Sequence, residues 1–146
     1  MTLAERIRKL LSELEKGLIE RENLLRLAFL AVVTQQPTYL YGRAGSGKRA
    51  LVEHLASGFR GLKVQSYGRR HLELPKETEP LDIAIFTSFE ASISQMTTAI
   101  RAILDENLSR EILISGRNRP DACLAEAGLA DSIHLVLTFP DSVSPD

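Results

Sequence analysis

The stretch Gly42-Arg43-Ala44-Gly45-Ser46-Gly47-Lys48 decides the fold, because it has the GxxxxGK spacing of a phosphate-binding loop. A short β-prone run, 38–41, precedes it, and a segment of helical character, 48–57, follows it. Glycines let successive backbone N–H groups turn toward an anion, and the next helix adds its free N–H groups and positive dipole end. The stretch therefore predicts a strand–loop–helix unit that binds phosphate, with Lys48 reaching the outer phosphates.

The position after Lys48 departs from the full phosphate-loop pattern. That pattern has Ser or Thr there, because the hydroxyl ligates Mg²⁺ beside the β- and γ-phosphates. This chain has Arg49, which cannot ligate a cation; it could add positive charge to the anion site or simply face solvent. We therefore expect residues 42–49 to bind nucleotide phosphates, while the loop itself offers no metal ligand and Mg²⁺ binding is left open.

Hydrophobic periodicity on both sides of the loop predicts alternating strands and helices. Short apolar strands separated by helices indicate a parallel sheet covered on both faces. We expect a three-layer α/β/α fold with about five parallel strands and two N-terminal helices. The expected helices are 3–17, 18–34, 48–57, one that begins after Ser88 and carries Ile93 to Leu104, and 120–129; the expected strands are 38–41, 62–66, 81–86, 111–115 and 133–138.

Length and composition fit one globular domain. The chain has 146 residues, 44% hydrophobic and 25% charged, which makes general disorder unlikely by composition. The net charge of −1 gives no indication of a nucleic-acid partner, and no apolar run is long enough to span a membrane. The single cysteine, Cys123, excludes a disulfide framework and favours a cytoplasmic protein. We expect residues 1–139 to form a nucleotide-binding domain, with 1–36 as its helical N-terminal part, and residues 140–146 to be a loose tail.

The acidic residues of a hydrolytic site are missing from their expected place. P-loop NTPases usually end a buried strand with an Asp that holds Mg²⁺. The matching strand, 81–86, is followed by Thr87 and Ser88, and Asp82 stands at its opposite end. Glu90 is the only nearby acid on the expected side. We expect Ser88 to cap the next helix with Glu90 in its first turn, and we keep Glu90 as a candidate catalytic residue.

Several segments resemble the MoxR branch of the AAA+ ATPases, particularly its RavA-like members. The run 17–22, Gly-Leu-Ile-Glu-Arg-Glu, resembles the "GLxER" stretch that follows the first helix of that family, and 27–31 resembles the helix that leads to its first strand. The resemblance implies ATP or ADP as ligand. It would place Leu18 and Ile19 beside the adenine, and the phosphates on residues 45–48.

The resemblance continues beyond the phosphate loop. Residues 112–118 resemble the strand that carries the sensor-1 residue, so Asn118 would point at the γ-phosphate and the attacking water. Arg117 and Arg119 flank Asn118 near the expected phosphate end of the sheet. The segments 125–131 and 139–141 also resemble parts of the family pattern.

Three departures from this pattern fall on the hydrolytic machinery, and the region between Ser66 and Leu81 is short for the inserts of the family. Arg49 replaces the Mg²⁺ hydroxyl, Thr87 and Ser88 replace the acids, and Ser132 stands where the family carries an arginine that reaches a neighbouring subunit. We therefore expect a degenerate relative that binds nucleotide and serves as a regulatory or complex-assembly component. The resemblance implies a von Willebrand A-type protein as partner, and a homo-oligomer or a hetero-oligomer with active AAA+ subunits.

Two alternative functions stay open, and so does the meaning of the short length of the sequence. The first alternative is an active MoxR-type ATPase chaperone in which Glu90 or an unusual metal shell compensates. The second is an interaction module whose phosphate loop is vestigial. The sequence ends just after the fifth expected strand, where family members continue into a helical lid. We expect either a piece cut at the domain boundary or a natural lidless remnant.

Overall fold

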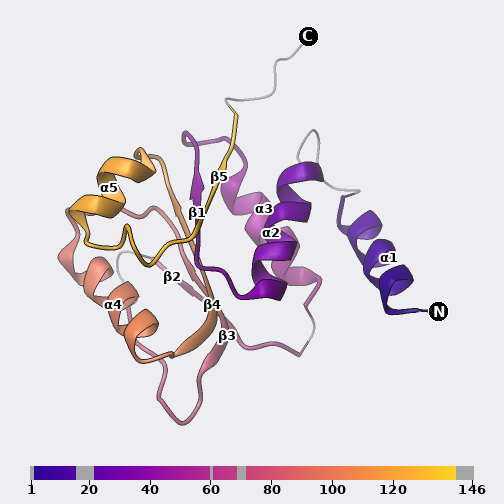
Figure 1. The fold of residues 1–146 in the computed structure, drawn as a ribbon, viewed down its shortest axis with the longest axis horizontal. Coiled ribbons are helices and arrows are strands. Elements are labelled where there is room, and N and C mark those ends of the chain that lie inside the picture. Colours follow the sequence, from indigo (N-terminus) through magenta and orange to yellow (C-terminus); the bar gives the residue numbers. More distant parts are fainter. Residues whose placement is uncertain (1, 16–21, 60, 69–71, 141–146) are drawn as a thin grey trace.

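The computed structural model describes residues 2–15, 22–59, 61–68 and 72–140, and within these ranges it contains five helices and five strands (Figure 1). In chain order they are α1 (Leu3–Glu15), α2 (Glu22–Thr34), β1 (Thr38–Tyr41), α3 (Lys48–Ser57), β2 (Val64–Tyr67), β3 (Leu81–Phe86), α4 (Ser94–Asp105), β4 (Ser109–Gly116), α5 (Pro120–Glu126) and β5 (Leu135–Thr138).

The strands form one parallel sheet with the order β2-β3-β4-β1-β5. β1 lies between β4 and β5. The chain leaves β1 for the β2 edge of the sheet, whereas the connection after β4 leads to the β5 edge. These two connections run in opposite directions across the sheet, and β1 and β4 end side by side; in open α/β sheets, ligands bind outside the carboxyl ends of the strands. The predicted α/β fold is confirmed.

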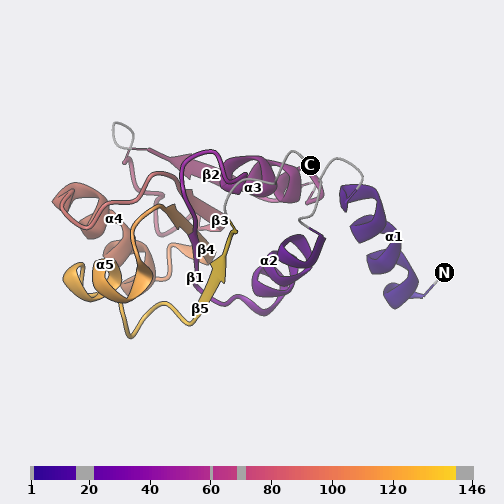
Figure 2. The same cartoon turned by 90° about the horizontal axis from the view of Figure 1, so that it is seen from above.

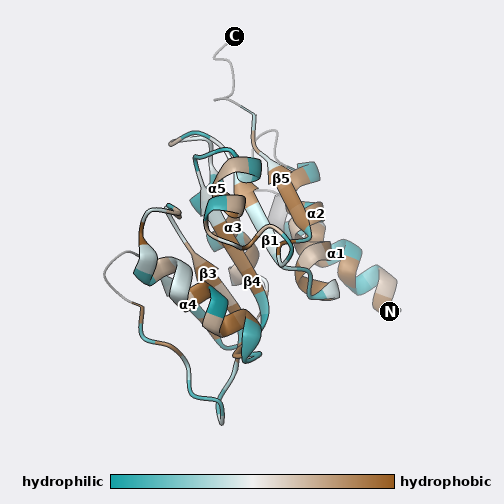
Figure 3. Ribbon diagram, turned by 60° about the vertical axis from the view of Figure 1, so that its left-hand side comes forward, coloured by the Kyte–Doolittle hydropathy of each residue, from teal (hydrophilic) through white to brown (hydrophobic). Residues whose placement is uncertain are grey.

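Helices cover both faces of the sheet (Figure 2). α2 and α3 pack on one face, against a core that includes Leu40, Ile85 and Leu113. α4 and α5 pack on the other face, against a core that includes Phe86 and Ile114. Hydrophobic residues follow β3, β4 and β5 (Figure 3). The central strands β3 and β4 are mostly buried, as expected for strands covered on both faces, whereas the edge strand β5 leaves Val136 exposed. α1 lies outside α2 and contributes only half-buried side chains to that layer.

The element bounds agree best near the phosphate loop. β1, α3 and β3 have the predicted bounds. β2 begins and ends later than predicted, and Tyr67, expected in a loop, is a buried strand residue whose ring stacks on Phe86 with centroids 4.8 Å apart. β4 is longer than predicted, β5 begins two residues later, and α5 ends at Glu126 rather than at residue 129. These differences reflect tertiary packing at element ends.

The segment after β3 differs from the prediction in a way that affects the site. Ser88 has φ of 56° and does not cap a helix; α4 begins at Ser94, with Ile93 as its N-cap. Glu90 therefore lies in a loop and not in the first turn of α4. The loop is anchored by Phe89, whose side chain is buried and whose backbone N–H donates to the Ser115 carbonyl at 2.8 Å.

Two sequence predictions fall on parts of the chain about which the structure gives no description. Leu18 and Ile19, expected beside the adenine, lie outside the described residues, and so do residues 141–146 of the expected tail. Among the residues that the structure describes, no helix has the length and apolar character needed to cross a membrane.

Candidate functional site

The phosphate loop connects β1 to α3 at the carboxyl end of the sheet. Gly45 and Gly47 have φ of 82° and 94°, a backbone region that other residues rarely adopt. Gly42 is needed for a different reason: a Cβ there would lie 2.6 Å from the Ser46 Oγ and 2.8 Å from the Phe139 Cβ. The loop thus closes tightly beside the end of β5, with two glycines in a backbone region that other residues rarely adopt.

Lys48 is folded back over this loop. Its Nζ donates to the carbonyl of Gly42, to the carbonyl of Arg43 at 2.9 Å and to the Ser46 Oγ at 3.5 Å. Partial burial lowers the pKa of the Lys48 ammonium. The lysine charge is therefore held at the loop by backbone oxygens, at the position where an incoming phosphate would compete for it.

A cleft of about 570 Å³ opens beside the loop, a size that suits a small-molecule ligand. It lies between the start of α3, the loop after β3 and the end of β4. Among its described lining residues are three cations and one acid. The cations are Lys48, Arg49 and Arg117, and the acid is Glu90. Ala44, Gly45 and Gly47 contribute the loop backbone, so the cleft presents a positively charged surface to a ligand.

The end of β3 presents hydroxyls rather than carboxylates to this cleft. Thr87 and Ser88 both line it. The Thr87 Oγ1 donates to the Tyr67 carbonyl at 3.4 Å, and the Thr87 N–H donates to the same carbonyl at 3.1 Å. The Thr87 hydroxyl is thus tied to the neighbouring strand, in the place where a metal-binding acid is expected.

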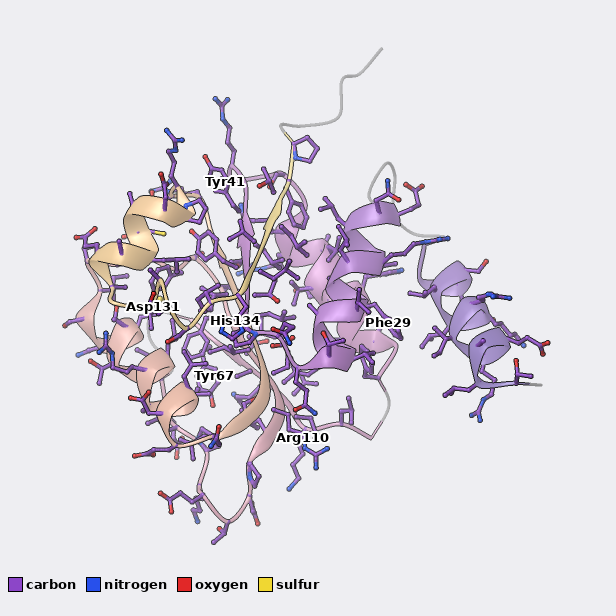
Figure 4. The ribbon with its side chains drawn as sticks, in the orientation of Figure 1. Phe29, Tyr41, Tyr67, Arg110, Asp131 and His134 are labelled. Atoms are coloured by element: carbon purple, nitrogen blue, oxygen red, sulfur yellow. The ribbon has the colours of Figure 1, made fainter. Side chains whose placement is uncertain are left out.

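Asp82 lies at the other end of β3, as predicted. One of its oxygens accepts the Lys63 N–H at 2.8 Å, and the other lies 3.7 Å from the Arg110 Nε. Figure 4 labels Arg110 at the end of the sheet opposite to Tyr41, which ends β1. Asp82 therefore makes contacts at the amino end of the sheet, at the far end of β3 from the loop, and is not placed to contact a phosphate bound there.

Glu90 reaches the cleft in spite of its unpredicted loop position. Its side chain is about a quarter exposed and lies 3.8 Å from the Arg117 guanidinium. It also lines a second, smaller cavity of about 260 Å³ beside α5. Glu90 is thus the acid that the described lining of the phosphate cleft contains, and it is paired with a cation there.

The end of β4 separates two residues that sequence reasoning treated together. Arg117 lines the phosphate cleft, whereas the exposed Asn118 lines the smaller cavity. The Asn118 carbonyl accepts a hydrogen bond from the buried Tyr39 hydroxyl at 2.9 Å, which fixes the chain at this point. The sensor role of Asn118 stays a prediction. Sequence reasoning did not select Arg117 as a site residue, although the basic pair around Asn118 was its signal.

The other residues named from the sequence lie in the loop, in the first turn of α3 and in the turn before β5. Arg43 is an exposed residue of the loop, and Ser46 is buried beneath it. Arg49 is exposed in the first turn of α3 and lines the cleft. Ser132 lies in the turn before β5, where its N–H donates to the Leu129 carbonyl at 3.0 Å.

The donor set fits a phosphate chain and does not fit Mg²⁺. A phosphate chain needs backbone N–H donors, a close backbone approach and cations. The cleft is lined by the glycine-rich loop, the start of α3 and three cations, which suit these needs. Mg²⁺ needs carboxylate or hydroxyl oxygens in octahedral geometry. Arg49 and the tied Thr87 hydroxyl do not supply them, and the described part of the chain holds no group of three His, Cys, Asp or Glu residues placed for a metal.

Comparisons with known proteins agree with this geometry. The sequence model of one family, the MoxR domain in the MoxR-vWA-beta-propeller ternary systems, matches residues 5–112. A solved structure with the same fold is AMPPCP-bound DnaA from Aquifex aeolicus, with a TM-score of 0.56 at 12% identity. The match covers 84% of this chain and 47% of the DnaA chain, so this chain spans about half the length of that neighbour.

Proposed function

The chain belongs to the MoxR domain family, a branch of the AAA+ P-loop ATPases, and we propose that it binds ATP or ADP through the phosphate chain and hydrolyses nucleotide weakly or not at all. The observation that carries this proposal is the make-up of one cleft. It combines a closed phosphate loop and Lys48 with Arg49 and Thr87 at the positions of the metal ligands.

Nucleotide binding is supported by hydrogen-bond donors and a lysine that the fold itself positions at the loop. The loop backbone and the first turn of α3 supply N–H donors, and Lys48 supplies a charge that can move from carbonyl oxygens to phosphate oxygens. The cations that line the cleft complement the negative charge of a phosphate chain.

Weak hydrolysis is supported by the lack of a base in the right place. A general base has to reach the attacking water, directly or through one water molecule. In the described lining of the cleft that base would be Glu90, which lies 3.8 Å from Arg117 and follows a turn with a strained residue, Ser88. Glu90 lies in a loop and its carboxylate faces Arg117, so its position gives little support to the role of a general base.

Support for a regulatory or assembly role comes from the family description and not from the cleft. The family description joins the MoxR domain to vWA and β-propeller proteins. We infer that this chain acts in the cytoplasm with a von Willebrand A-type partner, as a homo-oligomer or beside active AAA+ subunits. Analytical ultracentrifugation of the chain with such a partner, with and without ADP, tests this; sedimentation as separate species in both conditions contradicts it.

The nucleotide proposal is tested by calorimetry with ATP and ADP, each with Mg²⁺ and with EDTA, together with an assay of phosphate release. We expect binding that does not need Mg²⁺ and no steady release of phosphate. Lys48→Ala should weaken binding about 10- to 100-fold, because it removes charge-assisted hydrogen bonds to phosphate. Lys63→Ala is the matched control, since Lys63 lies at the other end of the sheet, and it should bind as the wild type does.

Each alternative has its own outcome in this experiment. Steady phosphate release that Lys48→Ala abolishes would identify an active ATPase, and Glu90→Gln would then test whether Glu90 supports it. The position of Glu90 in the cleft is the observation that favours this alternative. Absence of heat with either nucleotide, in both buffers, would identify a vestigial loop.

A further inference from the structure

The charge of the cleft points to a ligand that carries no metal ion. We propose that Arg117 recognises the terminal phosphate of a metal-free nucleoside triphosphate, so that Arg117 and Arg49 take the place that Mg²⁺ has in a hydrolytic P-loop site. This rests on the proposed nucleotide binding and adds the form of the ligand and the residue that distinguishes ATP from ADP.

The placement of Arg117 supports a role at the far end of the phosphate chain. It directly follows β4, the strand beside β1, and its side chain lines the same cleft as Lys48 and Arg49. Lys48 and Arg49 approach from the start of α3, whereas Arg117 approaches from the end of the neighbouring strand. A chain of phosphates that starts at the loop would therefore extend between these two groups of cations.

The residues after Arg117 do not share this position. The Asn118 carbonyl is bound to the Tyr39 hydroxyl, and its side chain faces the smaller cavity. Arg119 lines that same cavity, and its Nε lies 3.8 Å from Asp121. Of these neighbouring residues, Arg117 is the one that can meet a ligand in the phosphate cleft, and Arg119 is a natural control.

Glu90 gives Arg117 a partner while the cleft has no ligand. The pair is 3.8 Å apart, and the Arg117 side chain is 67% exposed. Ion pairs of this kind are weak and screened by salt, and phosphate binds a guanidinium more strongly through two parallel hydrogen bonds. A terminal phosphate would thus displace Glu90 from Arg117. The diphosphate lacks the group that makes this exchange.

Mg²⁺ should oppose this mode of binding. A bound Mg²⁺ cancels part of the phosphate charge that the cations of the cleft would otherwise meet. It would also bring positive charge near Arg49 and Arg117, with Glu90 as the acid available in the described lining. The cleft should therefore prefer ATP in EDTA over ATP in Mg²⁺, which is the reverse of a hydrolytic site.

Calorimetry in EDTA and in Mg²⁺ tests the proposal with ATP, ADP and inorganic tripolyphosphate. We expect ATP to bind about tenfold more tightly than ADP in EDTA, and Mg²⁺ to reduce the ATP affinity. Arg117→Gln should lower the ATP affinity to that of ADP and leave the ADP affinity unchanged. Glu90→Gln should raise the ATP affinity, and Arg119→Gln should change neither. Tripolyphosphate that loses affinity in Arg117→Gln supports recognition of the phosphate chain itself.

Several results would overturn the proposal. It fails if Arg117→Gln weakens ATP and ADP equally, if Arg119→Gln has the same effect as Arg117→Gln, or if Mg²⁺ strengthens ATP binding. Absence of binding by all three ligands would overturn the proposed nucleotide binding as well, whereas ATP binding with no dependence on Arg117 would overturn only this inference. Thermal unfolding of each variant checks that it is folded; the side chains of Arg117 and Arg119 are exposed, and that of Glu90 is about a quarter exposed.

Discussion

The two ends of the parallel sheet use their charged residues differently. At the carboxyl end, Lys48, Arg49 and Arg117 line a cleft with backbone N–H groups. At the amino end, Asp82 is bound to a backbone N–H and lies near Arg110, and Glu111 is almost fully buried. Carboxylates in a P-loop hydrolase belong at the carboxyl end, where they hold the metal. In this chain the charged residues at the carboxyl end suit an anionic ligand, whereas those at the amino end make contacts within the protein.

The largest effect is expected where the loop has no space. In Gly42→Val a Cβ would lie 2.6 Å from the Ser46 Oγ and 2.8 Å from the Phe139 Cβ, so the loop has to move. We expect no detectable heat with nucleotide and a loss of about 3 kcal/mol in unfolding free energy. Calorimetry and urea unfolding measure the two effects.

Gly61→Ala provides the control for this change. Gly61 has φ of 81°, but a Cβ there meets no atom within 4 Å, and it lies before β2, away from the cleft. It should lose about 1 kcal/mol through backbone strain and keep its nucleotide affinity. Equal loss of binding in both variants would show that strain in the chain, and not the shape of the loop, sets the affinity.

A smaller effect, on stability alone, is expected at Glu111. Burial raises the pKa of Glu111 to about 8, with only the Ile112 N–H to favour its charged form. The folded chain therefore holds a proton that the unfolded chain releases above its ordinary pKa of 4.5. Its contribution to stability is complete below that pH and is lost as the pH rises to about 8.

Glu111→Gln mimics the protonated side chain and removes this dependence. We expect the variant to be about 2 kcal/mol more stable than the wild type at pH 8 and similar to it near pH 4, as measured by urea unfolding. The exposed Glu79→Gln is the control and should follow the wild type at every pH. A wild-type stability that rises between pH 5 and pH 8 relative to Glu111→Gln would contradict the prediction.

The smallest effect is expected at Asp82. Asp82→Ala removes the acceptor of the Lys63 N–H and the partner of the exposed Arg110, which should cost about 1 kcal/mol. Nucleotide affinity should not change, because this side chain lies at the far end of the sheet from the loop. Altered binding or phosphate release in this variant would contradict the division between the two ends.

The parts of the fold that could be predicted are those set by local sequence. The glycines and Lys48 stand at fixed spacing between a strand and a helix, so β1 and α3 have their predicted bounds. The loop after β3 could not be predicted in this way. The left-handed Ser88 and the delayed start of α4 depend on Phe89, which is buried and bonded to Ser115 on β4, 26 positions along the chain.

The same reason limited the prediction of site residues. Whether Arg117 or Asn118 faces the cleft depends on the bond between Tyr39 and the Asn118 carbonyl, and so on residues 79 positions apart. Glu111 was expected at the start of a strand, but β4 begins at Ser109, so Glu111 lies inside the strand and is buried. The spacing of the loop residues predicts which kinds of residue meet there. The packing of β4 and α5 decides which side chain after β4 lines the cleft.

The folded-back Lys48 has a consequence for how fast and how tightly any anion binds. The carbonyl oxygens of Gly42 and Arg43 act as an internal competitor for the ammonium group. Loops with the lysine turned outward are then the competent fraction, and the apparent dissociation constant is the intrinsic one divided by that fraction. A change that weakens these internal hydrogen bonds would raise the affinity for an anion without adding any contact to the ligand. The backbone carbonyls of the loop thus limit the affinity that Lys48 can provide.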